Sequence, residues 1–411
     1  VFIPASGWVA DRLGARRVFT GAIAVFLAGS IVCGAAPSLT VLVAGRALQG
    51  LGGAMMTPVG RLVMLRSVPK SEMISAMAWL TIPALIGPVL GPPLGGFVTT
   101  WASWRWIFWI NLPIGLIGIV ASLALLPPIR EEATGAFDTT GFAVSALGLA
   151  ALVFALETAG RDVVPGVAVW GALALGLALL GLYLRHARRA ARPLIDLDLL
   201  RLPSFRAGVL GGSIFRLGVG ALPFLLPLQL QVGFGRTPLQ SGLTTFVAAI
   251  GAITMKLTAG RILTRFGFRD TLTVNAVIAG ALLAVVALVG PTTPVALIMA
   301  VLLAGGFFRS LEFTAINVVV YSEVDDDRMS RATSFAAMMQ QLSLSAGVAL
   351  GATALHLLSA AAERPPGAAE FSIAIALVGG LSIFAALVFA RLPADAGAEM
   401  LETAAGPRDE A

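Results

Sequence analysis

Long apolar stretches recur along the whole sequence and constrain its fold more than any other feature. Hydrophobic residues make up 57% of the 411 residues and charged residues only 12%, whereas a soluble domain carries about 25% charged residues. A chain this poor in charge cannot cover a soluble surface, so a soluble enzyme, a nucleic-acid-binding protein and a disordered scaffold are excluded for the chain as a whole. Because a helix needs about 20 apolar residues to cross a bilayer, the length allows roughly a dozen crossings.

Proline, glycine and charged residues mark the ends of these stretches and predict twelve membrane-spanning helices. The expected spans are 18–36, 39–65, 73–100, 105–127, 139–158, 165–184, 207–232, 239–263, 271–290, 294–320, 332–360 and 371–390. Helices are expected because they satisfy their backbone hydrogen bonds within one segment, and the alternating pattern of barrel strands is absent. The predicted fold class is an all-α polytopic membrane protein embedded in the lipid bilayer.

Basic residues are concentrated in every second loop, where Arg61, Arg66 and Lys70 are counted, and in the C-terminal tail. By the positive-inside rule these loops are cytoplasmic, which places both ends of the chain in the cytoplasm. The sequence has no signal peptide, and it starts at Val1 instead of a methionine. That start suggests a truncated or processed N-terminus.

The remaining composition excludes several kinds of chemistry. Cys33 is the only cysteine, so neither an intrachain disulfide nor a cysteine-based metal site is possible. His186 and His356 are too few for a zinc site without acidic help. Neither lysine, Lys70 or Lys256, follows the glycine that a Walker A sequence requires, so direct use of ATP is not expected. We expect no enzyme activity, no metal and no cofactor.

A short sequence occurs twice on the predicted cytoplasmic side. GWVADRLGARR begins at Gly7, and GRILTRFGFR begins at Gly260. Five positions align at a constant offset of 253 residues, with Thr264 in place of Asp11: Gly7 and Gly260, Asp11 and Thr264, Arg12 and Arg265, Gly14 and Gly267, Arg16 and Arg269. Such parallel repeats are typical of transporters built from two similar halves.

These residues resemble the signature loop of the major facilitator superfamily, G-x-L-A-D-R-x-G-R-K. Eight expected spans separate the two loops, whereas a twelve-helix member has six. The extra pair is most simply 139–158 and 165–184, which resembles the fourteen-helix drug:proton antiporter branch (EmrB/QacA-like). The resemblance implies two six-helix halves with two inserted helices, and the absence from this chain of helix 1 and most of helix 2. The implied domains are an incomplete N-terminal half at 1–130, inserted helices with a linker at 131–200, a C-terminal half at 201–393 and a cytoplasmic tail at 394–411.

The first signature loop is the predicted gating element. A loop with one acid and several bases can hold neighbouring helix ends in one conformation, and its release permits rocking between inward- and outward-facing states. The alternative is an ordinary basic turn, but the glycine spacing repeated in the second copy favours the gate. The gating residues are Gly7, Asp11, Arg12, Gly14 and Arg16.

The span at 39–65 contains GRALQGLGGAMM, which matches the family's fourth-helix motif at Arg46, Gln49 and Gly50. An arginine within a span is costly unless it faces protein or water. The resemblance makes Arg46 a candidate for proton coupling, and because it cannot lose its own proton, it would tune a nearby acid or hold an anion. The alternative is an arginine that caps backbone carbonyls.

The span at 73–100 contains PALIGPVLGPPLGG, which resembles the antiporter motif of the fifth helix. Glycines recur every fourth residue and form a bare stripe, and prolines bend the helix. The motif residues are Gly87, Pro88, Gly91, Pro92 and Gly95. Tight helix packing has the same physical basis, so only the match to the motif favours export. Trp104 to Gly115 also resembles the fourteen-helix branch, with Asn111 as a structural residue.

The C-terminal spans contain charges of their own. Arg216 is expected near the middle of the bilayer, and Arg309 and Glu312 are three residues apart on one helix face, where they can pair. Lys256 is open to two interpretations, a lysine that loses its proton or one whose side chain reaches the cytoplasm. Lys256 and Glu312 are therefore the other proton-coupling candidates.

Polar residues in the spans are candidates for a substrate cavity, although hydrogen bonding between helices is an equal alternative. The cavity candidates are Gln49, Arg216, Gln229, Arg309, Asn317, Gln340 and Gln341. RSLEFT at 309–314 and QQLSLSAG at 340–347 also resemble an MdtD-like sub-branch.

The function expected from these features is a proton-coupled antiporter that exports small organic molecules or drugs by alternating access. The alternatives are an importer or a carrier of organic anions or metabolites on the same fold, and a membrane sensor that transports nothing. The charges within the spans are mainly basic, which favours neutral or anionic substrates over cations. The expected partners are protons and a small-molecule substrate, with a monomer as the default assembly and the inner membrane as the location.

Overall fold

The computed structural model describes residues 2–69, 72–80, 87, 91, 94, 98, 101–127, 136–159, 164–190 and 193–400. The described chain is helical throughout and contains no strand. Eleven of its helices are long and apolar enough to cross a membrane, which confirms the predicted fold class. The twelfth expected span, 73–100, is helical at 73–80 and lies largely outside the described residues.

The region expected to form the N-terminal half contains η1 (Ile3–Ala5), α1 (Ser6–Leu13), α2 (Ala15–Gly34), α3 (Leu39–Ser67), α5 (Trp106–Trp109) and α6 (Asn111–Leu125). The expected inserted pair is α7 (Thr139–Thr158) and α8 (Gly166–Ala187). The C-terminal half consists of η3 (Leu197–Arg201), α9 (Pro203–Gly220), α10 (Leu222–Leu228), η4 (Gln229–Gly233), α11 (Pro238–Lys256), α12 (Ala259–Ala287), α13 (Val295–Val319), η5 (Asp326–Arg328), α14 (Met329–Ala361), α15 (Ala368–Ile383) and α16 (Ala385–Phe389).

Local sequence explains where several helices begin and how one changes pitch. Asp138 accepts a hydrogen bond from the backbone N–H of Gly141 and caps α7, and Thr237 with Gln240 forms a capping box at the start of α11. Pro227 has no backbone N–H to donate, and the π-helical turn η4 follows it directly. The proline thus accompanies a local change in the helix instead of ending the span.

Both copies of the repeated sequence have the same backbone form. In each, a short helical segment ends at a glycine with positive φ, 90° at Gly14 and 71° at Gly267, and a long helix follows. The expected spans 239–263 and 271–290 left residues 264–270 as a loop, and this is wrong, because these residues lie within α12 on either side of its break at Gly267. For the same reason the expected span 239–263 ends earlier, at Lys256.

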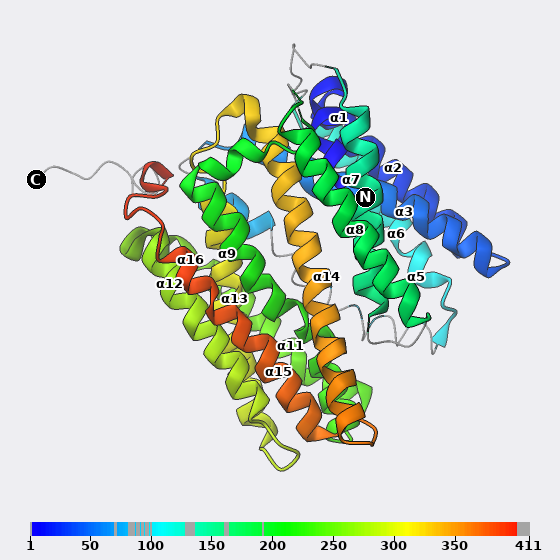
Figure 1. Ribbon diagram of the computed structural model, residues 1–411, viewed down its shortest axis with the longest axis vertical. Helices are drawn as coiled ribbons and strands as arrows, with labels where there is room; N and C mark the ends of the chain where they lie inside the picture. The colour runs from blue at the N-terminus through cyan, green and yellow to red at the C-terminus, as the bar shows by residue number, and fades with distance from the viewer. Residues whose placement is uncertain are drawn as a thin grey trace, which may run out of the picture.

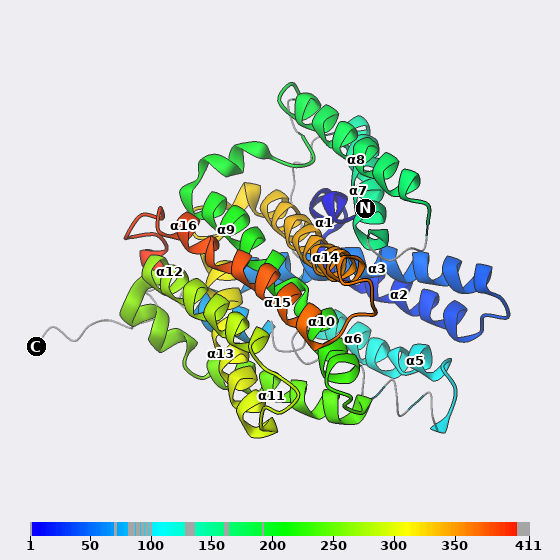
Figure 2. The same cartoon turned by 60° about the horizontal axis from the view of Figure 1, so that its bottom comes forward.

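The long helix α14 runs between two groups of helices (Figure 1). On one side lie α2, α3 and α6, and on the other lie α9 and α11–α13 with α15. The pair α7 and α8 packs together at the periphery, where α7 contacts α14 and η1 (Figure 2).

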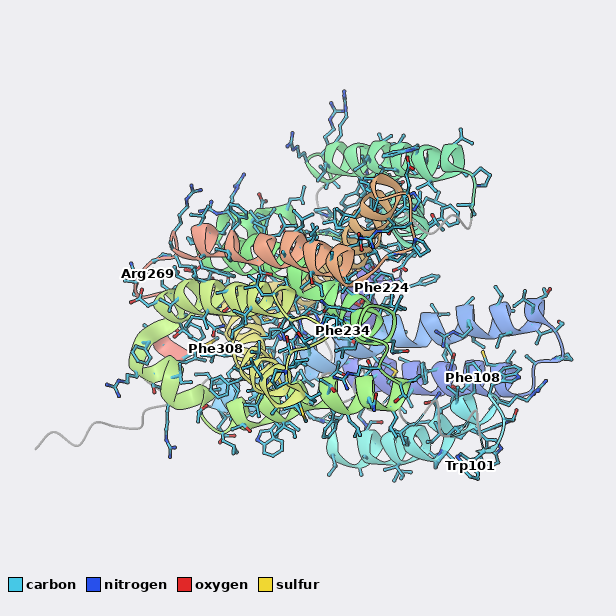
Figure 3. The ribbon with its side chains drawn as sticks, turned by 90° about the horizontal axis from the view of Figure 1, so that it is seen from below. Trp101, Phe108, Phe224, Phe234, Arg269 and Phe308 are labelled. Carbon is cyan, nitrogen blue, oxygen red and sulfur yellow. The ribbon has the colours of Figure 1, made fainter. Side chains whose placement is uncertain are left out.

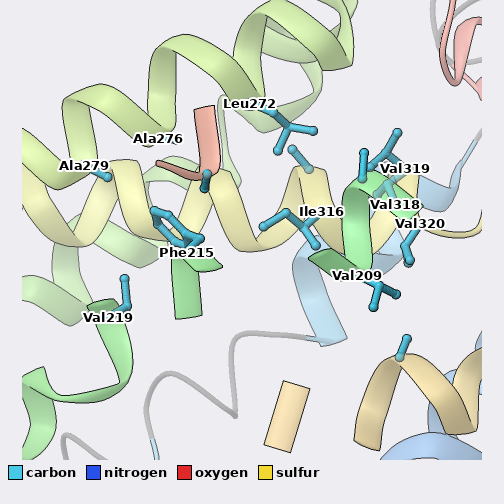
Figure 4. Close-up of a cluster of buried hydrophobic side chains, with 14 of the residues drawn as sticks. Val209, Phe215, Val219, Leu272, Ala276, Ala279, Ile316, Val318, Val319 and Val320 are labelled. Carbon is cyan, nitrogen blue, oxygen red and sulfur yellow. The ribbon is translucent and has the colours of Figure 1, made fainter. Parts of the chain in front are cut away.

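The C-terminal half has a continuous apolar core. Buried side chains from α9, α12 and α13 meet in it, including Phe215, Leu272, Ala276, Ile316 and Val319 (Figure 4). At the periphery, Trp101 and Phe108 lie on the opposite side of the molecule from Arg269 (Figure 3). Tryptophans are enriched at both interfaces of a membrane, and arginines in the loops on its cytoplasmic side.

We expect Gly267→Ala to destabilise the protein because φ 71° and ψ 172° form a backbone conformation open essentially only to glycine, at a cost of about 1–3 kcal/mol. No atom lies within 4 Å of an added Cβ at this position, so the loss would be purely conformational. Thermal unfolding in detergent measures the effect.

Gly260→Ala is the matched control for this experiment. It also meets no atom within 4 Å, but it has helical backbone angles within α12, so its stability should be unchanged or slightly raised. Equal stability of the two variants would contradict the assignment of the helix break to Gly267.

Candidate functional site

The two halves are joined at the end of the molecule where α3 ends and α14 begins. The Oγ atoms of Ser6 and Ser334 are 3.0 Å apart and share a hydrogen bond. Ser330 Oγ donates to Asp11 Oδ2, and Arg66 donates to the other Asp11 oxygen at 3.2 Å. We call this contact, formed by Ser6, Asp11, Arg66, Ser330 and Ser334, the inter-half closure.

Glycine at position 7 allows this close approach. A Cβ atom at Gly7 would lie 2.5 Å from the backbone oxygen of Ser330, a distance that real Cβ atoms do not adopt. Any larger residue would therefore push α1 away from α14. Gly7 and Asp11, two of the predicted gating residues, thus act in the closure itself.

The other predicted gating residues have different contacts. The guanidinium of Arg12 lies over the ring of Trp8, 5.4 Å from its centroid, and Arg16 donates to the carbonyl of Leu126 at 3.5 Å. Gly14 supplies the break between α1 and α2. These three residues shape and brace the N-terminal half and are not seen bridging it to α14.

A cavity of about 380 Å³ lies between α2, α3 and α14. Its polar lining within the described chain comes from both halves and consists of Arg46, Gln49, Thr57, Gln340 and Gln341. Arg46 is the only charged residue in this lining, and no described acid faces the cavity. Four of the residues expected at a proton or substrate site, Arg46, Gln49, Gln340 and Gln341, are therefore brought together.

Hydrogen bonds fix Arg46 at the wall of this cavity. Arg46 donates to Gln49 Oε1 at 2.9 Å, and Gln49 Nε2 donates to Ser30 Oγ at 2.5 Å. Asn111 donates to the same Ser30 oxygen at 3.2 Å, which supports a structural role for Asn111. The chain of bonds ties α3 to α2 and α6 and orients one guanidinium toward the cavity.

A second, smaller cavity lies between the halves and contains Arg61, Arg216, Asn317 and Gln340. Arg61 was counted in a cytoplasmic loop, and this assignment is wrong: it lies within α3 and is buried. It donates to the hydroxyl of Tyr321 at 3.2 Å and to Gln340 Oε1 at 3.5 Å. The predicted residues Arg216 and Asn317 are thus near the closure instead of in the larger cavity.

The expected pairing of Arg309 with Glu312 is also wrong. Glu312 is fully buried, and its Oε2 accepts a hydrogen bond of 2.6 Å from Asn275 on α12, while its Oε1 has no partner. The same Asn275 amide donates to the carbonyl of Phe308 at 2.8 Å. Because α13 packs against α12, the Asn275 amide reaches Glu312. The carboxyl therefore binds this neutral donor instead of Arg309 on its own helix.

Lys256 does not extend outward from the end of α11. Its Nζ donates to Thr314 Oγ1 on α13 at 2.7 Å, so the structure favours a lysine held between two helices over one that reaches the cytoplasm. Lys256 on α11 thus contacts α13, the helix that also carries Glu312. Neither residue lines the two cavities described above.

Three predictions fall elsewhere. Gln229 is buried and donates to Ser372 on α15 at 3.2 Å, which is the alternative of hydrogen bonding between helices. Arg309 lines neither of the two cavities. Of the antiporter motif, Pro88, Pro92 and Gly95 lie outside the described residues, and Gly87 and Gly91 have nothing within 4 Å of an added Cβ.

Sequence reasoning missed four residues that the structure places in contact with predicted site residues or in the cavities: Arg61, Arg66, Asn275 and Ser330. Arg61 lies inside the expected span 39–65, so an arginine within a span was the available signal. Arg66 was counted only as a positive charge. Nothing in the local sequence marks Asn275 or Ser330. Asn275 stands out only because it binds Glu312 on another helix, and Ser330 only because it binds Asp11.

A family model described as Major Facilitator Superfamily matches residues 1–348 and 208–406 of this chain. The MdtD protein of Serratia proteamaculans is 38% identical over 404 residues, which cover 96% of this chain and 83% of that protein. MdtD of Escherichia coli O157:H7 is 37% identical over 402 residues, covering 96% and 84%. Both relatives are named for multidrug resistance.

Two solved structures share the fold. The human organic anion transporter MFSD10 superposes with a TM-score of 0.68 at 15% identity, covering 94% of this chain and 80% of that one. The fucose:proton symporter FucP of E. coli gives 0.59 at 15% identity, covering 94% and 87%. At this level of identity, the likeness concerns the fold alone.

We expect Gly7→Ala to loosen the inter-half closure because the added methyl would overlap the Ser330 backbone. A Cys33→Ser background with Ser334→Cys provides the reporter, since Ser334 is only 2% exposed. A membrane-impermeant maleimide added to inside-out vesicles should label this cysteine severalfold faster when Gly7 is replaced. Gly21→Ala, with nothing within 4 Å of its Cβ, should label at the original rate. Unchanged labelling of the Gly7 variant would show that the closure does not depend on that glycine.

Proposed function

Because this chain belongs to the major facilitator superfamily, a family of membrane transporters, we propose that it is a proton-coupled antiporter that exports small organic molecules or drugs by alternating access. The observation that carries the proposal is a cavity lined by both halves together with a closure that joins the halves at one end only of the described structure. A transporter that rocks about a central site needs both features.

The closure supports a specific view of the transport cycle. The structure corresponds to a state in which the end carrying Arg12 and Arg66 is closed. Its hydrogen bonds involve hydroxyl groups and one carboxylate, Asp11, for which water can serve as an alternative partner. Opening would separate Ser6 from Ser334 and expose the cavity on the side of the membrane where the closure lies. This is the rocking motion that the repeated loops predict.

The basic end is proposed to face the cytoplasm. Arg12, Arg66 and Arg328 lie at this end, and the positive-inside rule assigns it to the inner side of the inner membrane. Both ends of the chain would then be cytoplasmic. The boundaries near residues 130, 200 and 393 remain proposed limits of the halves, and a monomer is the proposed assembly.

Export is favoured over import by the names of the MdtD relatives and by the motif at 87–95. Neutral or anionic substrates are favoured by the larger cavity, whose only charged group in the described lining is Arg46. A cavity for lipophilic cations would instead present acids. The alternative proposal is a carrier of organic anions or metabolites, and the description of MFSD10 as an organic anion transporter belongs to that protein.

Glu312 is the proposed proton carrier. It is the only acid that lies fully buried in the described spans, and one of its oxygens has no hydrogen-bond partner. A carboxyl held by a neutral amide can gain or lose a proton without breaking an ion pair. Arg46 and Lys256 remain candidates for tuning the coupling, and the three residues act from different helices.

Transport in everted vesicles tests the function. With an acidified lumen, neutral or anionic organic molecules should release protons and accumulate inside, because the vesicle lumen corresponds to the outside of the cell. Organic acids and ethidium are the probes. Proton release by ethidium with no response to organic acids would contradict the proposed substrate charge, and substrate movement only out of an acidified lumen would indicate an importer.

We expect Glu312→Gln to abolish substrate-driven proton release because an amide cannot carry the proton, while exchange of labelled for unlabelled substrate continues. The comparison of these two rates in the same vesicles separates coupling from folding. Asp270→Asn removes an exposed acid from α12 and should preserve both rates. Proton release that survives in Glu312→Gln would exclude Glu312 as the carrier.

A further inference from the structure

The smaller cavity lies where the two halves meet. Arg61 reaches it from α3 of the N-terminal half, and Arg216 reaches it from α9 of the C-terminal half. Asn317 on α13 and Gln340 on α14 complete its polar lining. Its volume is about 10 Å³, close to the space of one water molecule, so an organic molecule does not fit.

Both arginines are buried, and their guanidinium groups retain unused donors. Arg61 is 5% exposed and Arg216 4% exposed. Arg61 donates to Tyr321 and Gln340, but its Nε has no partner. Arg216 also has an unpartnered Nε, and its guanidinium lies over the ring of Phe313, 5.6 Å from the centroid. No hydrogen bond or ion pair to Arg216 is present in the described part of the chain.

No acid balances these two charges within the cavity. Its lining contains no described aspartate or glutamate. Glu312 on α13 is bound to Asn275 and forms no ion pair with Arg216, but the two charges attract each other at longer range. Two like charges buried in a low-dielectric region are strongly unfavourable unless a group of opposite charge compensates them. Counted together with Glu312, the two arginines leave one positive charge without a compensating negative charge among the described residues.

Neighbouring residues hold the donors in place around this point. A Cβ atom at Gly212 would lie 2.7 Å from Arg216 Nη1, so this glycine makes room for the guanidinium one turn along α9. Asn317 is 4% exposed, and its amide makes no described hydrogen bond. Two guanidinium groups and an amide from three helices thus share a space that admits a single small ion.

We propose that one small inorganic anion, chloride in the cell, binds between Arg61 and Arg216. The anion supplies the missing negative charge and accepts hydrogen bonds from both guanidinium groups. Because the two arginines belong to different halves, the bound anion stabilises the arrangement in which the inter-half closure is formed. This inference does not depend on what the protein transports.

Thermal unfolding of the purified protein tests the site. The melting temperature is measured in sodium gluconate, which is too large for the cavity, and again as sodium chloride or bromide replaces it at constant ionic strength. A saturable rise that follows a one-site curve is expected. Arg61→Gln and Arg216→Gln should each abolish this rise. Arg206→Gln removes an exposed arginine from the same helix as Arg216 and should keep the full response.

Asn317→Asp provides a test that does not rely on loss of stability. The substitution places a fixed carboxylate of nearly the same shape beside both arginines. Its melting temperature in gluconate should rise to that of the unsubstituted protein in saturating chloride, and its response to chloride should disappear. A merely structural role for these residues would produce neither change.

Three outcomes would overturn the proposal. One is an equal melting temperature in chloride and gluconate for the unsubstituted protein. Another is a chloride response that persists in both Arg61→Gln and Arg216→Gln, which would be a general salt effect. The third is an Asn317→Asp protein that is less stable in gluconate and still responds to chloride.

Discussion

The contact of α1 and α3 with the start of α14 is the interaction on which the state of this structure depends. Asp11 accepts from Ser330 and from Arg66, and Gly7 allows the two backbones to approach. Around this contact, buried apolar side chains from both parts of the chain, among them Ala10, Leu62, Met329 and Ala332, lie in one continuous cluster. The polar groups therefore fix how α1 and α14 meet, and in the proposed transport cycle they must separate before the cavity can open on this side.

The buried charged side chains of the described residues are mostly basic. Arg46, Arg61, Arg216 and Lys256 lie in or beside the interior, and Glu312 is the one fully buried acid among the described residues. Hydrogen bonds to neutral groups hold most of these cations: Gln49 for Arg46, Tyr321 and Gln340 for Arg61, and Thr314 for Lys256. A membrane interior that is basic overall attracts negative charge, which connects the expected substrate with the anion proposed between the halves.

Much of the fold could be predicted from the sequence because the bilayer imposes simple rules. Span length and positive loops predicted the membrane-spanning helices, of which the structure describes eleven. The 253-residue offset predicted a repeat, and both copies have a break at the matching glycine, Gly14 or Gly267. The candidate site was predicted less well. Arg46, Gln49, Gln340 and Gln341 do line one cavity, but Arg61 was assigned to a loop, and Arg309 was expected to pair with Glu312.

The sequence by itself determined the fold class, the spans and the charged residues that lie within the spans, where burial of a charge is costly. Helical periodicity also placed Arg309 and Glu312 on one face. Only the tertiary structure decided which neighbour each buried group meets, because Asn275 reaches Glu312 from another helix and Ser330 reaches Asp11 from the other half. Partners separated by tens to hundreds of residues are fixed by how helices rotate and pack, and no local pattern in the sequence records that rotation.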